Sequence, residues 1–253
     1  MVRMAADPVL RKLASNAGGS GTRAWLGGLP GVQLDSQSRR AVVVVPTTGE
    51  EARLYLTSLR AVGAHNAVNA GTAALLAMSL DVGITGKTIQ DAICQLQPPP
   101  HRMEIVFQDD KNVTWINDSK ATNVDAAVVG INGIVGRKAV VLLGGLGKPV
   151  STSEDGVVRY GFGRLASALA PHRAVVAFGA QGKSVQEELC AAGVTLPIER
   201  EETMVAAVER AGRLVEPGDV VLLSPACASF DEFNDFTHRG RVFAELANGS
   251  SKN

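Results

Sequence analysis

The sequence is poor in several features that mark specialised classes of protein. Its 253 residues include only three cysteines, four histidines and 4% aromatic residues, and 25 basic side chains balance 25 acidic ones. A chain without net charge has no general attraction for nucleic acid or for an anionic membrane surface. No apolar run reaches the length that a membrane-spanning helix requires. These deficits favour a globular protein whose partners are small molecules.

The few cysteines and histidines lack the arrangement of a disulfide framework or a metal site. Cys94, Cys190 and Cys227 are odd in number and far apart, in apolar stretches of sequence. We therefore expect reduced thiols in or near the core, and a reducing compartment. The histidines do not have the spacing of zinc ligands.

Two predicted helices and a run of prolines organise the first part of the chain. The Ala- and Leu-rich residues 66–80 predict one helix, and Thr85 can cap a second. Before them only one short strand is expected, at 40–45, so residues 1–60 look like the ragged end of a domain. The proline triplet at 98–100 ends the second helix and marks the best domain boundary.

Beyond the prolines, apolar strands alternate with helices. The segments EIVF and VTWI flank the turn DDKN as a hairpin, a helix follows from about Val124, and three short apolar runs then alternate with helical segments. This pattern indicates an α/β fold with a mostly parallel sheet that helices cover on both faces. In such sheets, ligands bind at the carboxyl ends of the strands.

Three polar segments follow three of these strands. They are Asn117–Asn123 (NDSKATN), Gly144–Lys148 (GGLGK) and Ser224–Phe233 (SPACASFDEF). A helix start needs one capping oxygen, which Thr122 or Asn123 can supply, so Asp118 and Lys120 favour a polar ligand in addition. GGLGK is either a flexible turn or a close backbone approach to a substrate, with Lys148 offering positive charge to a carboxylate or phosphate.

The third segment also has a purely structural interpretation. We expect it to open the terminal helix, with Ser229 as the N-cap or, with Glu232, as a capping box. Phe233, Phe236, Phe243 and Leu246 recur at helical spacing and are expected in the core.

Two short motifs imitate a nucleotide-binding loop without forming one. Gly86–Thr88 and Gly182–Ser184 both end like GxxxxGK[ST], but Asp81 and Ala177 stand where that motif requires its first glycine. No GxGxxG follows a predicted strand with an acid about twenty residues later, which argues against an NAD-dependent oxidoreductase.

The motifs HNAVN, PPPHRMEIV, WINDSKATN, LLGGLGK and LLSPACASFDEFNDFTHRG, in this order, resemble the Mur ligases, and in particular the members that add D-glutamate. The resemblance runs from about Trp25 to Leu246, with DSKATN and SPACASFD as its most specific motifs. It implies a Rossmann-like C-terminal Mur ligase domain at 98–253. Residues 1–97 would be a remnant of the central, ATP-binding domain.

The resemblance also implies an activity. The family uses ATP to activate a carboxylate as an acyl phosphate, which an amino acid then attacks in peptidoglycan synthesis. The implied substrates are D-glutamate, ATP and UDP-N-acetylmuramoyl-L-alanine, with ATP and Mg²⁺ as cofactors and neither nucleic acid nor membrane as partner. The implied compartment is the bacterial cytoplasm or, because the motif wording is closer to plant and algal members, the plastid stroma.

Specific residues acquire roles by the same resemblance. Those implied for D-glutamate are Thr122, Lys148, Ser229 and Phe236. Those implied for ATP are His65, Asn66, Asn69, Arg102, Asp118 and Lys120. Lys148 and Thr122 would hold one carboxylate of D-glutamate, and Ser229 with the backbone near Phe236 would hold the other.

The sequence also departs from the family pattern. Full members have a UDP-sugar domain and a central domain with a P-loop and magnesium-binding acids, and none of these features occurs in the 253 residues. We therefore expect the isolated chain not to form the amide bond. Another chain could carry the missing domains, or the protein could be a non-catalytic, Rossmann-like module for interaction or regulation.

Overall fold

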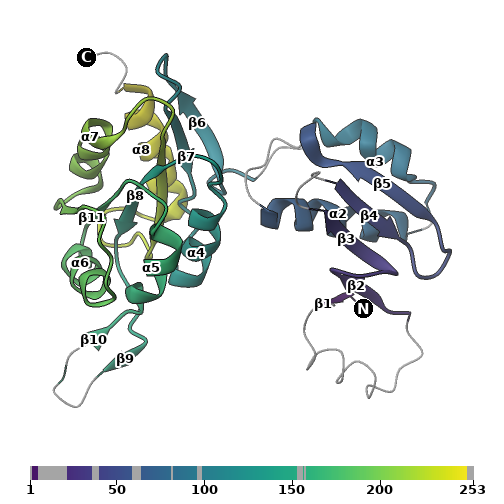
Figure 1. The fold of residues 1–253 in the computed structure, drawn as a ribbon, viewed down its shortest axis with the longest axis horizontal. Helices are drawn as coiled ribbons and strands as arrows, with labels where there is room; N and C mark the ends of the chain where they lie inside the picture. The colour runs from purple at the N-terminus through teal and green to yellow at the C-terminus, as the bar shows by residue number, and fades with distance from the viewer. Residues whose placement is uncertain are drawn as a thin grey trace. The chain divides into compact units, whose positions relative to one another are not determined.

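The chain divides into two compact units, Met1–Pro98 and Pro99–Asn253, and each is described by itself (Figure 1). The computed structural model describes residues 2–4, 22–35, 40–58, 64–80, 82–95, 99–152, 156 and 158–249. Among these residues, no helix combines the length and the apolar character that a membrane span needs.

The N-terminal unit is a five-stranded sheet with two helices packed on it. In sheet order its strands are β1 (Val2–Met4), β2 (Ala24–Leu26), β3 (Gly31–Asp35), β4 (Arg40–Val44) and β5 (Glu51–Tyr55). Burial alternates along β4 and β5, so one face of the sheet packs against α2 (Ala64–Met78) and α3 (Gly86–Ile93). A short 3₁₀ turn, η1 (Leu56–Ser58), follows β5.

This sheet is more regular than the sequence indicated. Only the strand at 40–45 was predicted, because its neighbours β3 and β5, of equal length, carry polar side chains between their apolar ones. The prediction for the second helix is confirmed, since the Thr85 hydroxyl accepts a hydrogen bond of 3.3 Å from the Thr88 amide at the start of α3.

The C-terminal unit contains a six-stranded sheet in the order β12-β11-β8-β13-β7-β6. Its strands are β6 (Glu104–Gln108), β7 (Thr114–Asn117), β8 (Ala139–Gly144), β11 (Ala174–Phe178), β12 (Ile198–Arg200) and β13 (Val220–Ala226). All neighbouring pairs are parallel except the β6–β7 hairpin. The predicted α/β fold with a mostly parallel sheet is confirmed.

Helices cover both faces of this sheet. They are α4 (Val124–Asn132), η2 (Phe162–Leu165), α5 (Ala166–Leu169), α6 (Gly182–Ala191), α7 (Met204–Leu214) and α8 (Phe236–Gly249). The chain steps from β7 through β8 and β11 to β12 in one direction and returns to β13 in the other. Because such crossovers are right-handed, α4, α5 and α6 lie on one face and α7 on the other, where it packs beside α8.

Two small features complete this unit. The strands β9 (Ser151–Thr152) and β10 (Val158–Arg159) pair as an antiparallel hairpin that projects from the body of the unit in Figure 1. Cys227 is buried as expected, but the expectation was wrong for Cys94 and Cys190, which are exposed. Each follows a buried residue, Ile93 or Leu189, by one position, and a step of one residue in a helix turns the side chain away from the core.

A ligand-binding edge at three strand ends

The three polar segments meet at one edge of the sheet. Strands β7, β13 and β8 are adjacent and parallel, so their carboxyl ends lie side by side. The segment after β7 begins with Asp118, whose amide donates to the Leu223 carbonyl of β13 at 2.8 Å. The segments after β8 and β13 join as a two-residue bridge, with Leu146 and Ala228 exchanging hydrogen bonds of 2.8 and 2.9 Å.

Asp118 lies beneath this edge in a buried hydrogen-bonded pair. One carboxylate oxygen accepts from the Ser224 hydroxyl at 2.9 Å, and the other accepts from the Met103 amide at 3.3 Å. Burial raises the pKa of Asp118 to about 6, although the bonds from Ser224 and Met103 and the charge of Arg102 oppose this rise. The Asp118 carboxyl therefore titrates close to neutral pH.

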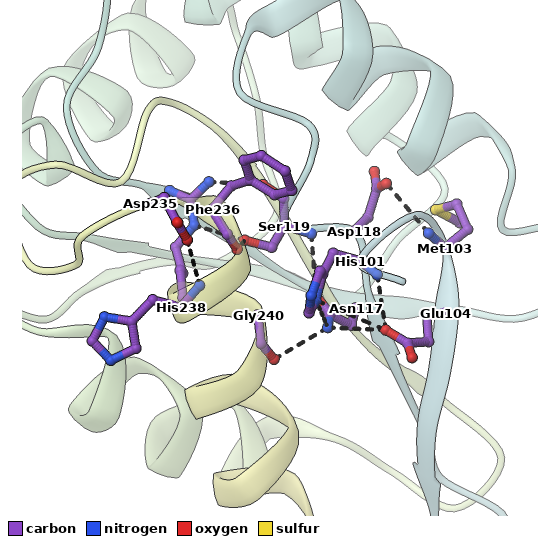
Figure 2. Close-up of polar contacts among 11 residues, drawn as sticks. His101, Met103, Glu104, Asn117, Asp118, Ser119, Asp235, Phe236, His238 and Gly240 are labelled. Carbon is purple, nitrogen blue, oxygen red and sulfur yellow. Dashed lines mark hydrogen bonds and ion pairs between the residues drawn. The ribbon is translucent and has the colours of Figure 1, made fainter. Parts of the chain in front are cut away.

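Asn117 is the centre of a second buried cluster. Its side-chain nitrogen lies 2.9 Å from His101 Nδ1, 3.3 Å from a Glu104 carboxylate oxygen and 3.1 Å from the Gly240 carbonyl of α8 (Figure 2). Its side-chain oxygen accepts from the Ser119 amide at 3.2 Å. These bonds tie the end of β7 to β6 and to the terminal helix.

Ser119 connects the same segment to α8. Its hydroxyl donates to the Phe236 carbonyl at 2.8 Å (Figure 2). The same hydroxyl accepts from Arg239 Nε at 3.0 Å. The Lys120 ammonium lies over the Phe236 ring, 3.8 Å from the ring centroid. A cation at this distance from an aromatic face is attracted by the ring quadrupole. Lys120, predicted for ATP, and Phe236, predicted for D-glutamate, are thus in direct contact.

The two glycines of GGLGK serve the packing of the backbone. Gly144 has φ +150°, and a Cβ there would lie 2.0 Å from the Phe178 carbonyl oxygen. Gly145 has φ +118°, and its Cβ would lie 2.4 Å from the Ala228 carbonyl oxygen. A side chain at either position would collide with a neighbouring strand end. Close approach to protein backbone is a reason for both glycines that the sequence did not reveal, and approach to a substrate stays a prediction.

The residues predicted for D-glutamate lie around this edge with different exposure. Lys148 is exposed, Thr122 and Phe236 are partly exposed, and Ser229 is 2% exposed. The predicted capping role of Ser229 and Glu232 is wrong. The terminal helix begins only at Phe236, and Asp235 accepts the 2.7 Å bond from the His238 amide in its first turn (Figure 2). Ser229 instead forms a turn, in which its carbonyl accepts from the Phe233 amide at 2.8 Å.

The structure also shows which residue caps α4, the helix that follows the segment Asn117–Asn123. Of the two candidates, Asn123 is the N-cap of α4, accepting from the Ala126 amide at 2.9 Å. Thr122 is therefore not required for capping.

The residues predicted for ATP are divided between the two units. Arg102, Asp118 and Lys120 belong to the C-terminal unit, where Arg102 is exposed and the Lys120 amide donates to the His101 carbonyl at 3.1 Å. Asn66 and Asn69 lie on α2 of the N-terminal unit, partly exposed and exposed respectively. His65 is also in α2, but its side chain lies outside the described part of the chain.

Sequence reasoning did not assign the residues that support this edge. Asn117, Ser119 and Ser224 lie inside the predicted segments without a predicted role, and the residues missed altogether are His101, Gly130, Arg239 and Gly240. The helix glycines carried a signal, since Gly is unfavourable inside a helix without a packing reason. A Cβ on Gly130 would lie 2.4 Å from Asp118 Oδ2, and one on Gly240 would lie 2.3 Å from His101 Nδ1.

Comparison with known proteins identifies the family. The model of the Mur ligase, glutamate ligase domain matches residues 101–227, just over half of the chain. The UDP-N-acetylmuramoylalanine--D-glutamate ligase of Thiobacillus denitrificans is 41% identical over 198 residues, covering 78% of this chain and 39% of the relative. The corresponding ligase of Bordetella parapertussis is 40% identical over 229 residues, covering 87% and 42%. The chain therefore spans about two fifths of the length of these curated relatives.

Solved structures share the fold at much lower identity. The UDP-N-acetylmuramate-alanine ligase MurC of Thermotoga maritima has a TM-score of 0.63 at 19% identity, over 98% of this chain and 51% of its own. A folylpolyglutamate synthase of Mycobacterium tuberculosis, complexed with ADP and AMPPCP, has a TM-score of 0.62 at 17% identity, over 96% and 54%. The motifs at the strand ends, the fold and the family model agree, and the chain belongs to the Mur ligase family.

Proposed function

We propose that the C-terminal unit is the D-glutamate-binding part of a UDP-N-acetylmuramoylalanine--D-glutamate ligase. The observation that carries the proposal is the meeting of NDSKATN, GGLGK and SPACASF at adjacent ends of parallel strands. The identity of about two fifths to the Thiobacillus and Bordetella ligases supports the choice of D-glutamate. We further propose that residues 1–97, all but the last residue of the N-terminal unit, correspond to the end of the central domain of those ligases.

The chemistry of the edge fits a dicarboxylate amino acid. In the proposed binding mode, the Lys148 ammonium and the Thr122 hydroxyl hold one carboxylate, and Ser229 with the start of α8 at Phe236 holds the other. Two anchored carboxylates leave the amine as the only free polar group of D-glutamate. Once deprotonated, that amine attacks the activated carboxyl carbon of UDP-N-acetylmuramoyl-L-alanine, forming the C–N bond as phosphate leaves.

Nucleotide binding is the second part of the proposal. ATP would supply the phosphoryl group that activates the acceptor carboxylate. Two cations near the end of β7, exposed Arg102 and partly exposed Lys120, suit a polyphosphate. Asp118 is less accessible, at 7% exposure with both oxygens bonded to protein, whereas Asn66 and Asn69 are proposed for the adenine.

Magnesium does not fit the residues of this edge. Within the described parts of the chain, no group of three or more His, Cys, Asp or Glu side chains could hold a metal ion. No step of the proposed reaction is therefore assigned to a metal held by these residues. For localisation, the bacterial relatives support a cytoplasmic site of action as part of the same proposal.

The first test is calorimetric titration of the chain with D-glutamate. We expect binding, weaker binding of L-glutamate, and a loss of about tenfold or more in affinity for Lys148→Met, because one bond to a charged group contributes roughly 1.5–3 kcal/mol. Lys138→Met is the matched control, since Lys138 is also exposed but precedes β8 at the opposite end of the strand. The control should bind as the parent does.

If the chain does not bind D-glutamate, the reason could be that binding needs an upstream domain, and this case must be distinguished from a wrong assignment of function. The same titration is therefore repeated on the chain fused behind the N-terminal part of the Thiobacillus denitrificans relative. If neither protein bound D-glutamate while both were folded by circular dichroism, the proposed function would be wrong.

A further inference from the structure

Arg239, on α8, has a bonding pattern that the proposed reaction does not explain. Its side chain is 0% exposed, and in the described residues it forms no salt bridge. The guanidinium donates only to neutral oxygens of the segments that follow β7 and β13. A fully buried cation without a paired carboxylate is costly, so its retention suggests a specific task.

The bonds of Arg239 span two of the three polar segments. Nε and Nη2 donate to the hydroxyl and carbonyl of Ser119 at 3.0 and 2.9 Å. Nη2 also donates to the Cys227 carbonyl at 3.0 Å, and Nη1 donates to the Ala228 carbonyl at 3.2 Å. The third segment is reached indirectly, because the Ala228 carbonyl also accepts from the Leu146 amide. One planar fork thus fixes the spacing of all three segments.

These carbonyl bonds also fix the direction of the next amide in the chain. In a trans peptide the C=O and the following N–H point in opposite directions. The amide after Ser119 belongs to Lys120 and donates to the His101 carbonyl, and the amide of Ala228 donates to Leu146. Only the third, the N–H of Ser229, has no acceptor among the residues that the structure describes. Because Ser229 is 2% exposed, this N–H needs a partner.

We propose that Arg239 is the positioning residue of this edge, holding the Ala228–Ser229 and Ser119–Lys120 peptides so that the Ser229 N–H is directed at a carboxylate of the bound amino acid. The inference deepens the proposed function and rests on it for the identity of the ligand. The orientation of the two peptides does not depend on that identity and can be measured without any ligand.

The test compares Arg239→Lys with Arg137→Lys. Lysine keeps the charge but presents it at one point, so it cannot bond Ser119 and Ala228 together. Arg137 is a matched control because it also bonds one hydroxyl and several carbonyls, those of Asn112, Gly218 and Asp219, but at the amino-terminal edge of the sheet. An effect seen in both variants therefore reflects a general loss of stability, whereas an effect seen only in Arg239→Lys reflects a change at the ligand-binding edge.

Two readouts are taken from each variant. In the ligand-free protein, we expect the N–H residual dipolar couplings of Ser229 and Lys120 to change in Arg239→Lys while those of β8 and β11 stay, and Arg137→Lys to leave both couplings unchanged. With D-glutamate, we expect Kd to rise by about tenfold or more in Arg239→Lys and by less than about twofold in Arg137→Lys.

The outcomes distinguish this inference from the proposed function. Unchanged couplings of Ser229 and Lys120 in folded Arg239→Lys, or an unchanged Kd, would overturn the positioning role. If neither the parent chain nor its fusion bound D-glutamate, the proposed function would fail, and the couplings alone would decide whether Arg239 orients these peptides. Should Arg239→Lys not fold, Ser119→Ala removes one acceptor of the fork, and unaltered couplings of Lys120 and Ser229 in that variant would reject the proposal.

Discussion

At the scale of single residues, the edge depends on buried groups beneath the exposed ones. Lys148 and Arg102 are exposed, whereas Asp118, Ser224 and Arg239 are buried, and their hydrogen bonds join the segments that follow β7 and β13. Burial disfavours the charged form of both Asp118 and Arg239, and it therefore shifts their pKa values in opposite directions. It raises the pKa of Asp118 to about 6 and lowers the pKa of Arg239 to about 10, so only Asp118 changes its charge near neutral pH.

The raised pKa of Asp118 predicts a dependence of stability on pH. Its ordinary pKa is 3.8 and its folded pKa is about 6, so the folded chain holds the proton more tightly than the unfolded chain. The contribution of Asp118 to stability is therefore full below pH 3.8 and is lost as the pH rises through 6. Relative to Asp118→Asn, the parent chain should lose up to about 3 kcal/mol of unfolding free energy between pH 4 and pH 7.

Urea unfolding of both proteins at several pH values measures this difference. Exposed Asp110→Asn provides the control for removing a negative charge, and its difference from the parent should vary little with pH. A difference for Asp118→Asn that stays constant from pH 4 to pH 7 would be incompatible with the raised pKa.

At the scale of elements, helices α4 and α8 approach the edge through glycines. Gly130 on α4 faces the Asp118–Ser224 pair, and Gly240 on α8 faces His101 and Asn117. In both places a polar cluster of the strand ends lies directly against the helix backbone. The absence of a side chain is thus what allows α4 and α8 to cover buried polar groups closely.

This packing predicts opposite effects for two glycine-to-alanine substitutions. Gly212→Ala on α7 should stabilise the chain by roughly 0.5–1 kcal/mol, because Ala favours the helix. The space there is open, since its Cβ would lie 4.0 Å from the nearest atom, on Trp115. Gly130→Ala should instead destabilise by about 1–3 kcal/mol, because its Cβ must displace the Asp118 carboxylate and the Ser224 hydroxyl.

Thermal and urea unfolding of the two variants compare these effects directly. The Asp118 carboxyl resonance should also move in Gly130→Ala and stay in Gly212→Ala. Equal stabilisation of both variants would mean that the contact between α4 and the Asp118–Ser224 pair is looser than the structure shows.

At the scale of the whole molecule, each unit has its own core. The cluster built on β7, β8, β11, β13, α7 and α8 contains residues from 113 to 247 only, and the cluster of the N-terminal unit contains residues from 24 to 93 only. Among the described residues, neither cluster includes a residue of the other unit. A unit with its own hydrophobic core can in principle fold alone.

Residues 99–253 expressed alone should therefore unfold cooperatively. They should also bind D-glutamate with a Kd within about threefold of that of the whole chain, since the residues proposed for this ligand all lie in the C-terminal unit. Calorimetry and urea unfolding of this part provide both measurements. A non-cooperative transition, with loss of near-ultraviolet circular dichroism, would show that the C-terminal core needs the N-terminal unit.

Much of the C-terminal unit could be predicted because its signals are local. Short apolar runs such as that of β8, the hairpin of β6 and β7, and the capping residue Asn123 are read directly from neighbouring residues. The start of α8 was misplaced because Ser229 and Glu232 fit a capping box as well as Asp235 fits a cap. The strands next to β4 in the N-terminal unit escaped prediction because polar residues interrupt their apolar ones, as in GVQLD and EARLY.

The sequence by itself determined the family, the alternation of strands and helices, and the three polar segments at strand ends, because period, capping and motif spacing are properties of consecutive residues. Only the tertiary structure decided which residues support those segments. Arg239 reaches Ser119 across 120 positions of sequence, and Ser224 reaches Asp118 across 106. No local pattern encodes such pairs, since they arise when parallel strands become neighbours and a terminal helix packs beneath their ends.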